Sequence, residues 1–196
     1  MTAIAKVAWR IFCAIELPAT IRERVLRSIA DLKEAVPDAR ASWARETNLH
    51  LTLKFLGEIP PTIVPDFSNA VSRAVVGIKS FPIRLEETGA FPTRGQPRVL
   101  WIGTNDYSGK LAELHAKVEE QSALAGFAKE VRPFHPHLTI ARLRNPQHAR
   151  TLATVHTQMK FEPVEATVSE LLVIRSELSS EGSNYTVVSR HPFAVR

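Results

Sequence analysis

The sequence has one cysteine and no long apolar run. Cys13 alone can form neither an intramolecular disulfide nor a cysteine-rich zinc site, and this scarcity is typical of a reducing compartment. Glu16 interrupts the apolar residues 11–15, a run too short for a signal-peptide core. No other stretch approaches the roughly 18 apolar residues that a membrane span needs. We therefore expect a soluble, cytoplasmic protein that does not contact a membrane.

The composition is that of a globular protein, because 44% of the 196 residues are apolar and can build a core. Disordered and fibrous classes are thereby excluded. Lys and Arg number 25 against 20 Asp and Glu, which gives a formal net charge of +5. This balance suits a phosphate-bearing partner, but many ordinary proteins share it. Charge alone therefore does not assign a function.

Apolar periodicity predicts alternating strands and helices along the chain. Strands are expected at 8–17, 49–56, 81–88, 98–103, 137–141, 166–175 and 185–189, and helices at 20–37, 61–77, 108–126 and 146–157. Thr20 and Asn145 are expected to cap the first and last helices, and Pro146 to occupy the first turn of the last helix. A turn is expected at 179–184 because of its Ser, Gly and Asn content.

The predicted elements repeat. After an initial strand, the order helix–strand–helix–strand–strand occurs in residues 19–104 and again in residues 108–190, with corresponding positions such as His50 and His137 about 87 residues apart. The last strands of the two units, at 98–103 and 185–189, match at the same offset. We expect one bilobal α+β domain, residues 1–196, whose two pseudo-symmetric lobes face each other across a central cleft.

Two equivalent predicted strands carry the same polar pair. They read His50-Leu-Thr52-Leu and His137-Leu-Thr139-Ile, and the strand period of two places His and Thr on one face. The first strand would also carry Lys54 on that face. Chance predicts about 0.1 such tetrapeptides with apolar residues at both intervening positions. Two copies at equivalent points of a repeat therefore indicate a functional site.

Paired imidazoles and hydroxyls fit displacement at phosphorus. Such a reaction needs a base for the nucleophile and an acid for the leaving oxygen on the opposite side, and histidine can serve either role near neutral pH. Threonine hydroxyls can donate to the non-bridging phosphoryl oxygens. A cyclic phosphodiester suits this set, because its strained ring lowers the barrier without a metal.

These residues carry a family resemblance. Two such tetrapeptides half a chain apart resemble the signature of the two-histidine phosphoesterases, and within them the chain resembles the RNA 2′,3′-cyclic phosphodiesterases, also called 2′-5′ RNA ligases. The matching segments are Arg10–Pro18, Trp43, Asn48–Gly57, Gly89–Phe91, Pro97–Gly103, Phe134–Arg142 and Ser176–Tyr185.

The resemblance implies two helix and antiparallel-sheet lobes around a cleft, and hydrolysis of RNA 2′,3′-cyclic phosphates to 2′-phosphates without metal or cofactor. In some members it implies reversible 2′-5′ joining of RNA. Carried over, His50 would be the proton donor, His137 the proton acceptor, and Thr52 and Thr139 the phosphate ligands. The two histidine roles are easily exchanged. The expected partner is RNA with cyclic phosphate ends, such as tRNA halves or short oligonucleotides, and the expected state is a monomer.

Nucleotide contacts are less sharply defined. Arg142 matches the family position for a nucleotide contact, yet in an ideal strand it points away from His137, so a bulge or the strand end must redirect it. Phe12 and Trp43 could stack on a base, although core packing is an equal prospect for Phe12. Arg40 and Arg45 flank Trp43 and could meet the RNA backbone or simply be solvated.

Two other functions compete with this interpretation. A binding module could hold the same RNA ends without turnover, although it would not need a paired acid and base. A metal hydrolase could use His135 and His137, whose spacing matches some metal sites, but no Asp or Glu lies nearby in the sequence. Activity in chelator would separate the metal hydrolase from the phosphodiesterase.

Overall fold

The computed structural model describes residues 8–145, 148–180 and 182–194. The helices are α1 (Ala19–Ala35), α2 (Val64–Ala74), α3 (Lys110–Leu124) and α4 (Ala149–Met159), with short 3₁₀ turns η1 (Glu46–Asn48) and η2 (Pro61–Ile63). The strands are β1 (Trp9–Glu16), β2 (Ser42–Trp43), β3 (His50–Ile59), β4 (Phe81–Phe91), β5 (Val99–Asn105), β6 (His137–Arg142), β7 (Val164–Val168), β8 (Glu170–Ser179) and β9 (Gly182–Pro192). Within these stretches no helix has the length and apolar character to cross a membrane.

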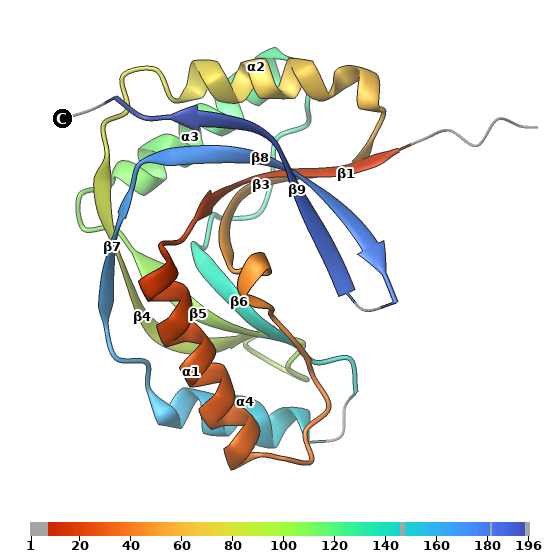
Figure 1. The fold of residues 1–196 in the computed structure, drawn as a ribbon, viewed down its shortest axis with the longest axis vertical. Coiled ribbons are helices and arrows are strands. Elements are labelled where there is room, and N and C mark those ends of the chain that lie inside the picture. Colours follow the sequence, from red (N-terminus) through yellow and green to blue (C-terminus); the bar gives the residue numbers. More distant parts are fainter. Residues whose placement is uncertain (1–7, 146–147, 181, 195–196) are drawn as a thin grey trace, which may run out of the picture.

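The described strands form two antiparallel sheets. One is four-stranded, in the order β3-β1-β8-β9, and the other is five-stranded, in the order β2-β6-β5-β4-β7. Figure 1 shows α2 and α3 together over the outer side of the first sheet, and α1 and α4 together over the second. The inner sides meet where β3 and β6 lie beside each other. The predicted α+β architecture of two helix-covered antiparallel sheets is confirmed.

Each sheet combines strands from both repeat units. The first takes β3 from one unit and β8 and β9 from the other, whereas the second takes β6 together with β4 and β5. β1 is the neighbour of β3 in the first sheet, and β5 is the neighbour of β6 in the second. Since β3 and β6 carry the equivalent histidines, β5 corresponds to β1. The sequence offset matched β5 with β9 instead, and this match is wrong. Because the units exchange strands, neither can complete a sheet alone.

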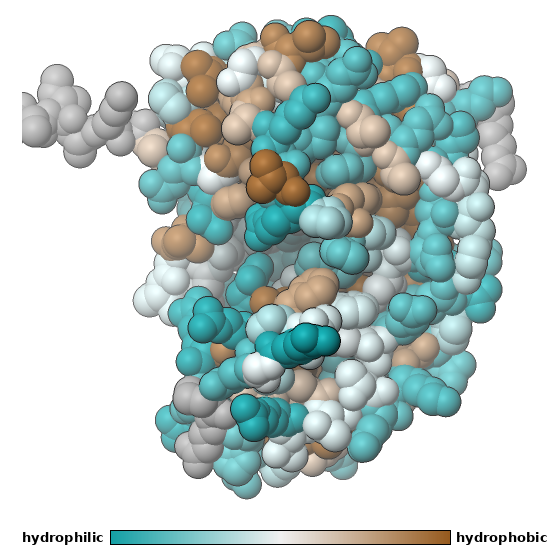
Figure 2. All heavy atoms as spheres, turned by 180° about the vertical axis from the view of Figure 1, so that it is seen from behind, coloured by the Kyte–Doolittle hydropathy of each residue, from teal (hydrophilic) through white to brown (hydrophobic). Residues whose placement is uncertain are grey.

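The core explains the apolar spacing of the chain. Residues 11–15 of β1 are all buried, because β1 lies inside its sheet and both of its faces are covered. Ile21, Val25, Ile29 and Leu32 form the buried stripe of α1. The face seen from behind is mainly hydrophilic, with apolar side chains in small groups (Figure 2).

Several predicted boundaries are wrong. The N-cap of α1 is Pro18 rather than Thr20, and the Pro18 carbonyl accepts the amides of residues 21 and 22. The N-cap of α4 is His148 rather than Asn145, and the predicted role of Pro146 lies outside the described residues. The strand expected at 166–175 is two strands, because β7 ends at residue 168 and β8 begins at residue 170 in the other sheet. The turn expected at 179–184 is shorter, since β9 starts at residue 182.

Candidate active site

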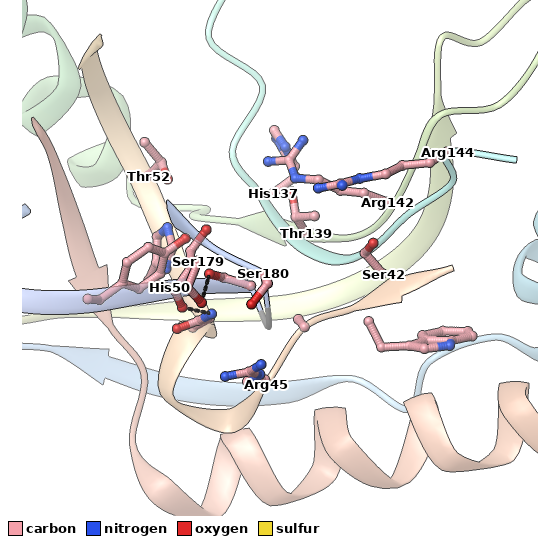
Figure 3. A pocket seen from close by; sticks show the side chains of 16 residues that line it. Ser42, Arg45, His50, Thr52, His137, Thr139, Arg142, Arg144, Ser179 and Ser180 are labelled. Carbon is pink, nitrogen blue, oxygen red and sulfur yellow. Dashed lines mark hydrogen bonds between the residues drawn. The ribbon is translucent and has the colours of Figure 1, made fainter. Parts of the chain in front are cut away.

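A cleft of about 400 Å³ lies between the two sheets, and both predicted His–Thr pairs line it. Figure 3 shows His50 and Thr52 on one side, and His137 and Thr139 on the other. The segment from β2 to η1 and the tip of the β8–β9 hairpin complete its wall. The cleft therefore brings together four side chains that lie in two sheets and 87 residues apart in the chain.

A bulge in β3 separates the site from the core. Thr52 pairs with Ala14 and Lys54 pairs with Cys13, so Leu53 is an extra residue between them. Lys54 consequently shares a face with Cys13 rather than with Thr52. Its side chain is buried, and its ammonium binds the Glu119 carboxylate at 2.8 Å and the Ala128 carbonyl at 2.8 Å. The predicted placement of Lys54 beside His50 is wrong for this reason.

The equivalent bulge in β6 has the opposite effect on Arg142. Thr139 pairs with Trp101 and residue 141 with residue 100, so Ile140 is the extra residue. Arg142 then pairs with Val99, on the same face as Thr139, and its side chain lines the cleft. The sequence required a bulge or a strand end to bring Arg142 to the site. The structure has that bulge.

His50 packs against two aromatic rings that also contact each other. Phe12 lies 4.8 Å from it and Tyr185 lies 5.2 Å from it, centroid to centroid. The pKa of His50 is lowered to about 4, mainly by burial, and the Arg142 charge contributes to this lowering. The Asn48 carbonyl opposes these effects, although no hydrogen bond of normal geometry reaches the buried Nδ1. The ring is therefore neutral at pH 7.

His137 is fixed by its own backbone. Its Nδ1 lies 2.7 Å from the His135 carbonyl, which can only accept a hydrogen bond, so Nδ1 carries the proton and Nε2 keeps a lone pair. The Phe91 ring packs edge-on at 5.1 Å. Burial lowers the pKa of His137, the His135 carbonyl opposes this, and the Arg142 charge adds to the lowering. Arg142 lines the same cleft as both histidines, and its charge lowers the pKa of each.

The described lining of the cleft is cationic. It contains Arg45, Arg142 and Arg144, together with hydroxyls and the Asn48 amide, and no carboxylate among the residues that the structure describes. Asn48 also donates to the Ser183 carbonyl at 2.9 Å, which ties η1 to the β8–β9 hairpin. Such a lining favours an anion with several oxygens, such as a phosphate.

The proposed nucleotide contacts divide into two groups. Trp43 and Arg45 line the cleft, whereas Arg40 does not. Phe12 is 3% exposed and packs beneath His50, so it cannot stack on a base and its predicted nucleotide contact is wrong. Sequence reasoning missed Arg144, which lines the cleft but lies beyond the end of β6, where the strand period no longer applies. It also missed the hydroxyls of the hairpin tip, which it interpreted only as a turn.

His135 precedes β6 rather than belonging to it. It meets His137 through its backbone carbonyl, not as a second imidazole on the same strand face. In the described part of the chain, no group of three or more His, Cys, Asp or Glu side chains is arranged to hold a metal ion.

Comparison with known proteins places the chain in a family. Residues 18–179 match the family model described as the 2′-5′ RNA ligase superfamily. A protein of Methanothermobacter thermautotrophicus named RNA 2′,3′-cyclic phosphodiesterase is 32% identical over 90% of this chain and 95% of its own length. A protein of the same name from Thermus thermophilus is 36% identical over 95% and 90%, respectively. The crystal structure of E. coli LigT complexed with 3′-AMP superposes with a TM-score of 0.76 at 27% identity, covering 95% of this chain and 99% of LigT. The chain therefore belongs to the 2′-5′ RNA ligase superfamily, as its paired histidine motifs predicted.

Proposed function

We propose that the protein is an RNA 2′,3′-cyclic phosphodiesterase that opens the cyclic phosphate to a 2′-phosphomonoester by paired-histidine acid and base catalysis. One observation carries this proposal: two His–Thr pairs from different sheets line the same cationic cleft. The shared name of the relatives supports the reaction type. The nucleotide in the LigT complex supports a nucleotide-phosphate ligand for this fold.

The reaction is an in-line displacement at phosphorus. His137 takes a proton from water through Nε2 while the water oxygen bonds to phosphorus. The bond between phosphorus and O3′ breaks on the opposite side, and His50 gives a proton to O3′. The products are a 2′-phosphate and a free 3′-hydroxyl, and the two histidines have exchanged protonation states. A second proton exchange with solvent restores the enzyme.

The remaining polar side chains stabilise the transferred charge. Thr52 and Thr139 share the faces of their histidines, so each hydroxyl can donate to a non-bridging oxygen of a phosphate held between the strands. Arg142 can pair with the same group and balance its negative charge. This arrangement gives the chain's own residues every role in the step, and we propose no metal or cofactor.

The low pKa values of the histidines set a condition on this mechanism. His50 must be protonated to act as the acid, yet burial and Arg142 favour its neutral form before substrate binds. A bound phosphate anion favours the protonated ring and raises its pKa. The acid therefore forms when substrate enters. For His137 the lowered pKa keeps Nε2 free to act as a base.

Replacing water by the 5′-hydroxyl of another RNA would give a 2′-5′ linkage by the same step, and we include this joining reaction in the proposal. The substrates proposed are RNA ends with a 2′,3′-cyclic phosphate, on tRNA halves or short oligonucleotides, and the acting form is a monomer. The cationic cleft and the group-transfer geometry support both reactions.

The test is incubation with a short RNA ending in a 2′,3′-cyclic phosphate, with and without EDTA. Expected is a 2′-phosphomonoester, at the same rate in both. A 3′-phosphate product would contradict the assignment of the leaving oxygen. Binding without turnover would instead identify an RNA-end binding module, and loss of activity in EDTA would favour a metal hydrolase.

A further inference from the structure

A second cavity of about 330 Å³ adjoins the central cleft, and His137 lines both. It lies over β4 and β5, on the sheet face that carries the site. The register shows this, because Gly103 pairs with His137 and Trp101 pairs with both Thr139 and Gly89. A ligand in this cavity would therefore reach the outer side of the His137 imidazole.

Aromatic rings form the wall of this cavity. Phe91 and Trp101 lie 5.3 Å apart, centroid to centroid, and both line it. The indole rests directly on Gly89, where an added Cβ would collide with the ring. Flat apolar walls of this kind suit the face of a nucleobase or the carbon side of a ribose.

A third bulge supplies carboxylates to the cavity. Glu86 pairs with Gly103 and Thr88 with Ile102, so Glu87 is the extra residue, and its φ is 59°. The bulge places Glu86 on the face of the site, where the Tyr107 hydroxyl donates to its carboxylate at 2.7 Å. Glu86 and Glu87 both line the cavity. The Glu87 carboxylate can accept from the hydroxyl and amino groups of a ligand, whereas Oε1 of Glu86 already accepts from Tyr107 and Asn105.

The two cavities differ in charge. The described lining of the second cavity contains two carboxylates and no Lys or Arg, whereas that of the central cleft contains three arginines and no carboxylate. Glu86 is paired with Arg84 at 3.0 Å, so Glu87 is the carboxylate that disfavours a phosphate in the second cavity, whereas the arginines of the cleft attract one. An uncharged nucleoside with its hydroxyl and amino donors fits the second cavity instead.

The outer side of His50 offers less room. Phe12 and Tyr185 cover it, and the cavity there is about 220 Å³. Arg22 and Glu46, which line that smaller cavity, form an ion pair at 3.4 Å. Of the two histidines, His137 borders the larger space. A water nucleophile needs no such space, but a nucleoside alcohol does.

We propose that the cavity beside His137 is a subsite for the terminal nucleoside of a second RNA strand, one that ends in a free 5′-hydroxyl. This rests on the proposed function, in which His137 activates the incoming oxygen. The 5′-hydroxyl loses its proton to His137 as O5′ bonds to phosphorus. The bond from phosphorus to O3′ breaks, and O3′ takes a proton from His50. No other reactant is needed.

The experiment measures how one substrate divides between two products. A short RNA with a 2′,3′-cyclic phosphate is incubated with increasing adenosine, and the 2′-phosphomonoester and the 2′-5′-joined product are quantified. Joined product should rise to saturation with adenosine. The variant Thr93→Trp, at an exposed position of the cavity wall, should lower it at least tenfold and leave hydrolysis within twofold. Thr62→Trp, exposed on η2 and lining neither cavity, is the matched control and should change neither product.

A competition experiment tests the charge preference. Because 5′-deoxyadenosine lacks the 5′-hydroxyl that joins to phosphorus, it should occupy the subsite without reacting there, and it should suppress joining to adenosine at least tenfold better than adenosine 5′-monophosphate does. In Glu87→Gln the two competitors should suppress joining to a more similar extent. The two competitors acting equally in the wild type would overturn the charge argument.

The outcomes separate the two proposals. The subsite proposal would be overturned if hydrolysis occurred but joining did not saturate with adenosine, or if Thr93→Trp left joining unchanged. Either result would leave the proposed phosphodiesterase activity standing. Equal loss of hydrolysis and joining in Thr93→Trp and Glu87→Gln would mean that the cavity holds the nucleoside bearing the cyclic phosphate, which also overturns the acceptor assignment. No consumption of the cyclic phosphate by the wild type would overturn the proposed function itself.

Discussion

Replacing Lys54 by methionine should destabilise the protein without slowing its reaction. The Lys54 ammonium binds both Glu119 oxygens, at 2.8 and 2.9 Å, and the Ala128 carbonyl at 2.8 Å. The side chains of Lys54 and Glu119 are 3% and 12% exposed. Removing one partner of a buried ion pair leaves the other charge uncompensated, at a cost of about 3–5 kcal/mol. Because the Leu53 bulge turns Lys54 away from the cleft, kcat/KM of the folded variant should stay within about twofold of wild type.

Urea unfolding followed by tryptophan fluorescence measures the stability change. The matched control is Lys117→Met, which breaks an exposed pair with Glu113 on α3 and should cost about 0.5 kcal/mol or less. Lys54→Met combined with Glu119→Leu should be more stable than Lys54→Met alone, because no charge is then left unpaired. A Lys54→Met variant of wild-type stability but impaired turnover would refute the reasoning and return Lys54 to the catalytic face.

Three further predictions concern the site. Thr52→Ala and Thr139→Ala should each slow turnover, by up to about 10²–10³ for a lost oxyanion donor, with unchanged urea midpoints; a wild-type rate in either would remove that hydroxyl from the site. Arg142→Gln should lower kcat/KM about 10- to 100-fold and raise the pKa of both site histidines, since Arg142 lowers both; NMR titration checks this, and unshifted values would count against it. The pKa of His50 is about 4 in the folded protein and about 6.5 in the unfolded chain. The free energy of unfolding should therefore fall by about 3 kcal/mol as the pH drops from 6.5 to 4, because over this range the unfolded chain binds a proton that the buried ring does not. In His50→Gln the free energy of unfolding should depend less steeply on pH over this range. A pH dependence equal to that of the wild type would contradict the pKa shift.

Local periodicity predicted the parts of the site that lie within one strand. The period of two placed Thr52 beside His50 and Thr139 beside His137, and both pairs line the cleft. The same rule fails immediately after Thr52 and after Thr139, because the next residues, Leu53 and Ile140, are bulged. Each bulge moves the residues that follow it to the opposite face of the strand from the one that a regular strand predicts. Nothing in these apolar residues marks a bulge. Register depends on the partner strands, which a single sequence does not specify.

Long-range pairing also limited the fold prediction. The order of elements indicated two similar lobes, but it did not show that β8 crosses to the sheet of β1 and β3. The aromatic Phe12 was ambiguous for a related reason. In an apolar strand, the sequence does not reveal which face packs against a neighbour, and here that face lies under His50.

The most direct test of the central claim compares the single variants His50→Ala and His137→Ala with the double variant on an RNA ending in a 2′,3′-cyclic phosphate. If the two imidazoles act together as acid and base, each single variant loses most of the rate and the double variant is about as slow as the slower single one, because groups that act as a unit are strongly non-additive. A single variant with wild-type turnover, or a double variant much slower than either single one, would contradict paired-histidine catalysis.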